Sequence, residues 1–422
     1  MPRIYRTLII TLLLTVSAYN TFAAYILIPM DEVQKNHLKA YGITFWVLKN
    51  NVDVYWLLNY RGGSFMCKFG KTIENECVIR GVTYQVIADA QSTAILTEIS
   101  DPSTNMDAVE LNKVPKIAVY TPPGKRPWDD AVTMALTYAE IPFDKVYDEE
   151  VMQGKLPLYD WLHLHHEDFT GQYGKFWGAY RNAAWYQEDV RLQEQIAQKL
   201  GFSKVSQCKL AVVKKIRDFT AGGGYLFAMC SAPDSYDVAL AADGIDICDV
   251  PFDGDAMDAN SQSKLNYENC FAFTNFKIVT NPYEYAISNI DVTHSRKVPK
   301  TSDFFTLFDF SAKWDPVPTM LCQSHERILK GFMGQTTSFR ASCIKPGVLV
   351  MGENKSAAEV KYLHGEFGKG TFTFYGGHDP EDYNHFVGDP PTDLNLHPNS
   401  AGYRLILNNV LYPAPKKKKQ KS

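Results

Sequence analysis

The sequence predicts an α/β protein, in which a parallel, doubly wound sheet follows a smaller α/β unit. Three observations predict it. Short apolar runs alternate with amphipathic stretches of helical period, which is the pattern of strand–helix–strand units. Aromatic residues make up 13% and charged residues 21% of the 422 residues, a composition typical of a chain with a large core. Residues 243–345 break the alternation and are rich in Asp, Asn, Pro and aromatics, which indicates a long insertion.

The first unit, residues 24–112, begins with an apolar run at 25–29 that predicts a strand. A helix is expected at 37–47, where apolar residues recur at helical spacing, and a second strand at 52–58. A strand, a helix and a strand in this order form a βαβ unit, which favours a parallel sheet. Further strands or short helices are expected at 82–88 and 94–99, and a linker at 101–105.

The second unit, residues 115–413, repeats the alternation and is followed by a basic tail at 414–422. Its helix at 208–219 is expected to end on the glycines at 222–224, since glycine suits the left-handed conformation that closes a helix. Strands are expected at 116–120, 143–147, 159–166, 225–229, 348–351, 360–364 and 371–375. The remaining helices are expected at 129–139 and 402–411.

The N-terminus has the order of a secretory signal peptide. Arg3 and Arg6 precede a mostly apolar run at 8–14, and small residues follow as far as Ala23. The run is shorter than the roughly 20 apolar residues of a membrane span. We therefore expect residues 1–23 to be cleaved and the mature chain to be periplasmic or secreted, with an uncleaved anchor as the alternative. No later run reaches about 18 apolar residues, so we expect no transmembrane segment after cleavage.

The net charge limits the possible binding partners, and the cysteine spacing limits the possible metal and redox motifs. The net charge of −4 provides no basic field for nucleic acid. The lysines at 416–419 are expected to be a solvated end or a contact with an anionic surface. Eight cysteines follow the signal segment without a C-x-x-C pair, so neither a zinc ribbon nor a thioredoxin-type motif is supported. A disulfide between Cys67 and Cys77 is left open.

Chemistry-bearing residues gather where predicted strands end, which is where a parallel α/β sheet places its ligands. The first group is Cys230, in "GGGYLFAMCSAPD". The second is "HLHHED", residues 163–168, and the third is "GGHDPEDY", residues 376–383. A thiol beside an imidazole can act as a nucleophile, because the imidazolium lowers the thiol pKa. The alternative for Cys230 is a buried, inert thiol.

The order of four motifs resembles the class I glutamine amidotransferase-like superfamily, and most closely its trehalose-utilisation (ThuA-like) branch. The motifs are "PKIAVY", "YDWLHLHH", "IRDFTAGGGYLFAMCSA" and "GKGTFTFYGGHDPEDY". The resemblance covers residues 115–240 and 345–413 and implies a flavodoxin- or amidotransferase-like sheet. It also implies Cys230 as nucleophile and His378 as base. Asp379 or Glu381 could then orient the imidazole.

The chain departs from that family at the nucleophile. Catalytic members carry glycines two residues before and after the cysteine, whereas this chain has Ala228 and Ala232. Glycines ease the strained turn and leave room for substrate. Two hypotheses therefore stay open: a Cys-dependent hydrolase or amidase of the cell envelope, and a non-catalytic binding module on the same fold. The module would bind a small molecule, a glycan, a peptide or an envelope partner.

The histidine-rich motif and one glycine turn offer further sites. His165, His166 and Glu167 combine imidazole with carboxylate, which suits zinc or a related divalent metal. A metal-dependent hydrolase is therefore a third hypothesis. Alternatively, His166, Glu167 and Asp168 hydrogen-bond a substrate, or the motif is a plain polar strand end. Arg61, in a glycine turn, could hold an anion or merely close the turn.

Nearly the whole chain also resembles exported bacterial proteins labelled asparagine synthetase B, through "LIPMDEVQKNHLKAYG" and "LLNYRGGSF". The chemistry of that label requires an N-terminal cysteine and a Ser-Gly-Gly-x-Asp-Ser pyrophosphate loop. The sequence has neither, and an exported protein has no supply of ATP. We therefore expect the label to reflect the amidotransferase-like fold and not the synthetase reaction.

Overall fold

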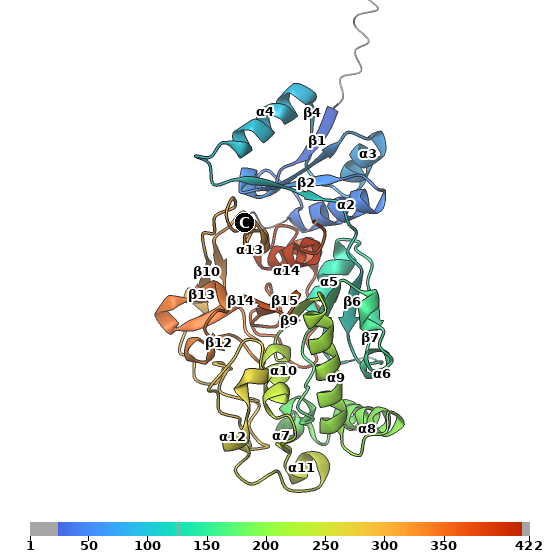
Figure 1. Ribbon diagram of the computed structural model, residues 1–422, viewed down its shortest axis with the longest axis vertical. Coiled ribbons are helices and arrows are strands. Elements are labelled where there is room, and N and C mark those ends of the chain that lie inside the picture. The colour runs from blue at the N-terminus through green and yellow to red at the C-terminus, as the bar shows by residue number, and fades with distance from the viewer. Residues whose placement is uncertain (1–23, 125, 416–422) are drawn as a thin grey trace, which may run out of the picture.

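The computed structural model describes residues 24–124 and 126–415, so the expected signal segment and nearly all of the basic tail lie outside it. The chain forms a small sheet at one end and a large mixed sheet in the middle, with helices against both (Figure 1). An α/β protein is therefore confirmed. Among the described residues, no helix is long and apolar enough to cross a membrane.

The small sheet contains five strands in the order β4-β1-β3-β2-β5, and every neighbouring pair is antiparallel. The expected parallel sheet is therefore wrong for this unit. The reason lies at residues 59–63, where Asn59 and Arg61 take positive φ angles of 59° and 45°. The chain reverses there, and β3 enters between β1 and β2. The strands are β1 (Ala24–Ile28), β2 (Val54–Leu58), β3 (Ser64–Lys68), β4 (Gln85–Ala88) and β5 (Asp107–Leu111).

Three helices complete this unit: α2 (His37–Lys49), α3 (Lys71–Ile79) and α4 (Asp89–Ser100). The Asn36 side chain caps α2 by accepting from the Lys39 amide. Helices α2 and α4 cover opposite faces of the sheet (Figure 1), because alternate side chains along each strand point to opposite faces. The helix α4 resolves the region 94–99, which the sequence left open between strand and helix.

The large sheet has a parallel half and an antiparallel half. The parallel strands are neighbours in the order β15-β9-β8-β6-β7. They are β6 (Ile117–Tyr120), β7 (Asp144–Val146), β8 (Trp161–Leu164), β9 (Tyr225–Met229) and β15 (Gly370–Tyr375). All five lie where the sequence predicted strands.

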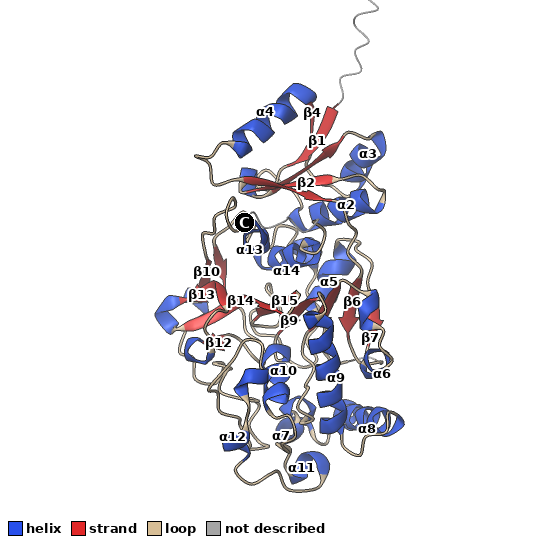
Figure 2. Ribbon diagram, in the orientation of Figure 1, coloured by secondary structure: helices blue, strands red, loops and turns tan. Residues whose placement is uncertain are grey.

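The sheet continues past β15 with antiparallel strands, so it is not parallel throughout as expected. The cause is the short turn before β15, where Gly368 has φ 63° and reverses the chain. The strands are β10 (Phe304–Leu307), β11 (Ile328–Lys330), β12 (Phe339–Arg340), β13 (Leu349–Asn354) and β14 (Glu359–Phe367). The first three belong to the insertion, most of which is loop (Figure 2).

Helices cover both faces of the parallel strands. One face packs against α5 (Ala131–Tyr138) and α14 (Ala401–Leu411). The other packs against α9 (Val205–Ala221) and α10 (Ala232–Ala241). The remaining helices are α6 (Asp148–Met152), α7 (Trp177–Tyr180), α8 (Ala184–Lys199), α11 (Val250–Asp253), α12 (Ser261–Lys264) and α13 (Pro316–Leu321).

The two units share one core, because α2 packs on α5 and α14. Arg404 of α14 is fully buried at this junction. Its Nη1 donates to the Met30 carbonyl at 3.0 Å, and its Nε donates to the Tyr41 hydroxyl at 3.0 Å. A buried guanidinium is tolerated only when its donors are satisfied, so these bonds tie α14 to the N-terminal unit.

The eight cysteines are all free thiols, and all lie within the described residues. Cys67 on β3 and Cys77 on α3 are both buried. Burial raises the pKa of each to about 12, with the neighbouring Cys77 adding to the shift of Cys67. The disulfide left open by the sequence is therefore not formed in this structure.

Candidate functional site

Cys230 stands on a strained turn between β9 and α10. Its φ is 53°, in the left-handed region that non-glycine residues seldom adopt. Ser231 follows as the N-cap of α10, and the Ala232 amide donates to the His165 carbonyl at 3.0 Å. Ala228 and Ala232 are fully buried. The turn therefore forms with alanines in place of glycines, and the strain falls on Cys230 itself.

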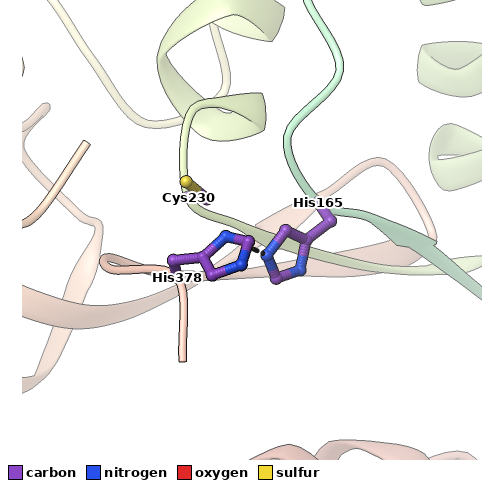
Figure 3. Close-up of side chains that lie close together, drawn as sticks. All are labelled: His165, Cys230 and His378. Carbon is purple, nitrogen blue, oxygen red and sulfur yellow. Dashed lines mark hydrogen bonds between the residues drawn. The ribbon is translucent and has the colours of Figure 1, made fainter. Parts of the chain in front are cut away.

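Two imidazole rings face the Cys230 sulfur (Figure 3). The Sγ of Cys230 and one ring nitrogen each of His165 and His378 lie within 4.8 Å of one another. The exposed fractions are 2% for Cys230, 0% for His165 and 6% for His378. The three residues follow β9, β8 and β15, which are parallel neighbours. The fold thus gathers them because parallel strands present their carboxyl ends at one edge.

His378 is held at both ring nitrogens. Its Nε2 lies 3.0 Å from Asp129 Oδ1, and its Nδ1 lies 3.0 Å from His165 Nε2. Burial alone lowers the pKa of His378, but the hydrogen bonds with Asp129 and Cys230 outweigh it and raise that pKa to about 10. His378 is therefore an imidazolium at neutral pH, and an imidazolium beside a thiol favours the thiolate.

His165 is the neutral partner of this pair. Burial, together with the charge on His378, lowers the pKa of His165 well below its usual value. The cationic His378 then donates from Nδ1 to His165 Nε2, so the His165 proton resides on Nδ1. That nitrogen faces Asp130, whose Oδ1 is 3.8 Å away. Asp130 also caps α5 by accepting from the Thr133 amide at 2.8 Å.

The carboxylate that orients His378 is not one of those the sequence suggested. Asp379 is fully buried, and its Oδ1 accepts from the Glu381 amide at 2.8 Å. Glu381 pairs instead with His397, Oε2 to Nδ1, at 3.1 Å. Asp129 takes the role expected of Asp379 or Glu381, since the loop after β6 brings it over the strand ends. Only one feature of the sequence could have indicated this role, namely that Asp129 follows the end of the predicted strand β6.

Sequence patterns also did not single out His385, which lies beside His378. Its ring stacks on that of His378, with centroids 4.6 Å apart and planes 21° from parallel. Its Nδ1 lies 2.9 Å from Asp382 Oδ2, and its Nε2 lies 3.5 Å from Asp129 Oδ1. His385 belongs to the loop just past "GGHDPEDY", where no periodicity marks a functional side chain.

The metal set expected from "HLHHED" does not assemble. His165 turns toward Cys230 and His378, whereas His166 Nε2 accepts from the Trp128 indole. Glu167 Oε2 accepts from the His165 amide at 3.1 Å, which fixes the turn after β8. Successive residues beyond the strand point in different directions, so His165, His166 and Glu167 do not converge on one point.

Three of the four residues expected to bind substrate line a small cavity. His166 and Glu167 line it together with Asp168 and Trp128, and its volume is about 30 Å³, roughly that of one water molecule. Burial raises the pKa of Glu167 to about 8, with the Asp130 charge adding to the effect. Glu167 Oε1 has no hydrogen-bond partner. Asp168 is satisfied by its own loop, because it accepts from the Thr170 and Gly174 amides.

Arg61 lies apart from this cluster, in the turn between β2 and β3. Its Nε is 2.7 Å from Asp31 Oδ2, and Arg61 and Asp31 belong to the N-terminal unit. The guanidinium therefore closes a turn beside a carboxylate, which leaves little of its charge for an anion. Arg61 does not join the residues at the strand ends.

Aromatic side chains pack beside the site, next to His166. The Trp128 ring stacks on Phe176, with centroids 5.2 Å apart, and Phe176 contacts Tyr285 at 5.4 Å. Tyr285 comes from the insertion, and Gln335 Nε2 donates to its carbonyl at 3.1 Å. The insertion therefore closes over the strand ends instead of lying at a distance from them.

Comparisons with known proteins add little. No family model matches the chain, and no curated protein matches it. Its structure is similar to the cytoplasmic protein STM1381 of Salmonella typhimurium LT2, with 13% identity over 71% of this chain and all of the other, and a TM-score of 0.37. It is also similar to the cytoplasmic protein STM3548 of Salmonella typhimurium, with 11% sequence identity over 72% of this chain and all of the other, and a TM-score of 0.36.

A third similar structure is that of Gan42B, a GH42 beta-galactosidase from G. stearothermophilus. It is 9% identical over 63% of this chain and 28% of its own, with a TM-score of 0.26. All three TM-scores are low.

Proposed function

We propose that the protein is a thiol-dependent hydrolase that cleaves amides or esters through a thioester on Cys230. The observation that carries the proposal is the position of Cys230. Its backbone is held at φ 53°, at the end of β9 and the start of α10, with its sulfur beside two imidazoles. Strained non-glycine residues persist where the surrounding structure enforces them, and such residues cluster at active sites.

The side chains supply each proton transfer that this chemistry needs. The Cys230 thiolate attacks the carbonyl carbon, a C–S bond forms, and the π electrons move to oxygen. The Ser231 amide, at the head of α10, donates to that oxyanion. When the tetrahedral intermediate collapses, the C–N or C–O bond breaks, and His378 gives its Nδ1 proton to the leaving group.

Hydrolysis of the thioester reverses these roles. A water molecule gives a proton to the now neutral His378 as its oxygen attacks the thioester carbon. The C–S bond then breaks, the acid leaves and the Cys230 thiolate is restored. Asp129 is a positioning residue in both halves, because its hydrogen bond holds the His378 ring and stabilises the imidazolium.

We also propose a core fold and a cellular location for this reaction. The order β7-β6-β8-β9-β15, with helices on both faces, supports a doubly wound, flavodoxin-like core. The strand-end cysteine and histidine support the resemblance to class I amidotransferase-like proteins. The charged, apolar and small-residue order of residues 1–23 supports export. Together they suggest an amidase or esterase acting in the cell envelope.

The experiment is to trap the acyl-enzyme. Metal-free mature protein is mixed with an activated acetyl ester, quenched in acid and digested for peptide mass mapping. The expected result is one acetyl group on the peptide containing Cys230, and none in Cys230→Ala. Cys343→Ser, which removes another buried free thiol, is the matched control and should acylate normally. Ester turnover that is equal in Cys230→Ala and wild type would refute the proposal.

One observation favours a second candidate, a binding module without catalysis. Cys230 is only 2% exposed, and the cavity lined by the nearby His166 has a volume of about 30 Å³, which is too small for a substrate. A module of this kind would leave Cys230 unacylated by every ester and amide tested. The trapping experiment therefore separates the two candidates.

A further inference from the structure

We propose that His165, Cys230 and His378 also form a zinc site, and that Zn²⁺ bound there silences the thiol. The geometry of the three side chains supports metal binding by itself. The loss of activity on zinc binding rests on the proposed function. This set differs from the one expected from the sequence, because it replaces His166 and Glu167 with residues from two other strand ends.

The three ligand atoms already lie at the spacing of ligands around one ion. His165 Nε2 and His378 Nδ1 are 3.0 Å apart, close to the separation of two nitrogens that each bind zinc at about 2.0–2.1 Å in a tetrahedron. The Cys230 sulfur lies within 4.8 Å of one nitrogen of each ring. Thiolate and imidazole are the ligands that zinc prefers in proteins.

Carboxylates behind both rings are a second, independent observation. Metal-binding histidines nearly always donate their other N–H to a carboxylate or carbonyl, which fixes the tautomer and raises ligand basicity. His378 Nε2 faces Asp129 Oδ1 at 3.0 Å, and His165 Nδ1 faces Asp130 Oδ1 at 3.8 Å. Each ring thus has a carboxylate on one side and turns its other nitrogen, Nδ1 of His378 and Nε2 of His165, toward the other ring.

Two competing triads use the same neighbourhood, but each is a weaker zinc site. Asp129, His378 and His385 form one, and Asp130, His163 and His165 form the other. Neither contains sulfur, and each consumes a carboxylate that otherwise orients a histidine. The set with Cys230 is also the one in which all three ligands are buried.

Three protein ligands leave the fourth tetrahedral position open to water, as in catalytic zinc sites, where that position exchanges between water and substrate. A zinc ion at this site coordinates the Cys230 sulfur through the lone pair that would attack the carbonyl. It also coordinates His378 Nδ1, the atom that would carry the proton. The Cys230 sulfur can then neither attack a carbonyl nor hand a proton to His378. Zinc should therefore inhibit the hydrolase reversibly, and a chelator should restore it.

The test uses mature full-length protein stripped with a chelator and titrated with Co²⁺, which reports zinc-type sites by absorption. The expected result is one cobalt per chain, with a sulfur-to-cobalt band in the near ultraviolet that Zn²⁺ abolishes. Cys230→Ser should remove the band, and His165→Asn should weaken cobalt binding at least about tenfold. Cys343→Ser should bind as wild type does. Circular dichroism checks that each variant is folded.

Any of three results would overturn the metal site. The first is no sulfur–cobalt band in wild type, and the second is a band that survives Cys230→Ser. A band lost only in Cys248→Ser would also overturn it, since Asp246, Cys248 and Asp253 form a separate candidate group. Cobalt binding with no ester acylation of the metal-free protein would keep the site and refute the proposed hydrolase. Acylation unchanged by saturating zinc would overturn the inhibition.

Discussion

The hydrogen bond between Asp129 and His378 makes the strongest quantitative prediction. Asp129→Asn replaces the carboxylate with a neutral amide of the same shape. The two side chains are 10% and 8% exposed, with the atoms 3.0 Å apart. A hydrogen bond to a charged group contributes about 1.5–3 kcal/mol, and one pKa unit corresponds to about 1.4 kcal/mol. The pKa of His378, about 10 in the native protein, should therefore fall by about 1–2 units.

The assay is a pH titration of metal-free protein labelled with ¹⁵N in its histidine rings, with His378→Asn used for assignment. Glu381→Gln is the matched control, because Glu381 pairs with His397 and not with His378. It should leave the His378 titration unchanged. A wild-type His378 that titrates near its ordinary value of 6.5, or an unchanged titration in Asp129→Asn, would refute the reasoning.

The same shift predicts how stability depends on pH. The pKa of His378 is raised in the folded protein, so the folded state binds the proton more tightly than the unfolded chain does. This stabilisation is fully present below pH 6.5 and is lost as the pH rises through about 10. Denaturation of metal-free Asp129→Asn should show a smaller loss of stability over that window than wild type.

Three further predictions concern stability, each measured by chemical denaturation. Cys230→Gly should be about 1 kcal/mol more stable than Cys230→Ala, since only glycine relieves the positive φ; equal stabilities would mean that the turn stores no strain. Lys209→Met should cost about 3–5 kcal/mol, because it leaves the buried Asp148, 2.8 Å from the Lys209 ammonium, without its partner; a loss below about 1 kcal/mol would contradict this. Gly42→Ala should separate α2 from α5, since the new Cβ would lie 1.8 Å from the Ala139 carbonyl oxygen; an unchanged stability would mean that the two units do not pack there.

Local patterns predicted the five parallel strands, including the run that ends at Cys230, but they missed the helices α8 and α10. The run at 225–229 and the glycines before it lead to β9, and Cys230 follows directly. The carboxyl-end rule then placed Cys230 and His378 together, because it depends only on strand direction. Such predictions succeed where nearby residues decide the structure.

Two of the misses depend on contacts distant in sequence, and one has a local cause. Asp129 lies 249 residues from His378, and nothing near it marks it as a hydrogen-bond partner. The small sheet is antiparallel because β3 pairs between β1 and β2, which the strand–helix–strand order alone cannot show. His166 and Glu167 diverge from His165 because the chain has left the strand, where the alternation of faces no longer holds.

The most direct test of the central claim is the rate at which iodoacetamide alkylates Cys230 in the native, metal-free protein, followed against pH by peptide mapping. The other seven cysteines serve as internal references. The account predicts that Cys230 is alkylated fastest of the eight cysteines at neutral pH, and that Asp129→Asn slows its alkylation. A Cys230 that stays as unreactive as Cys67 and Cys77 across this range would contradict the account.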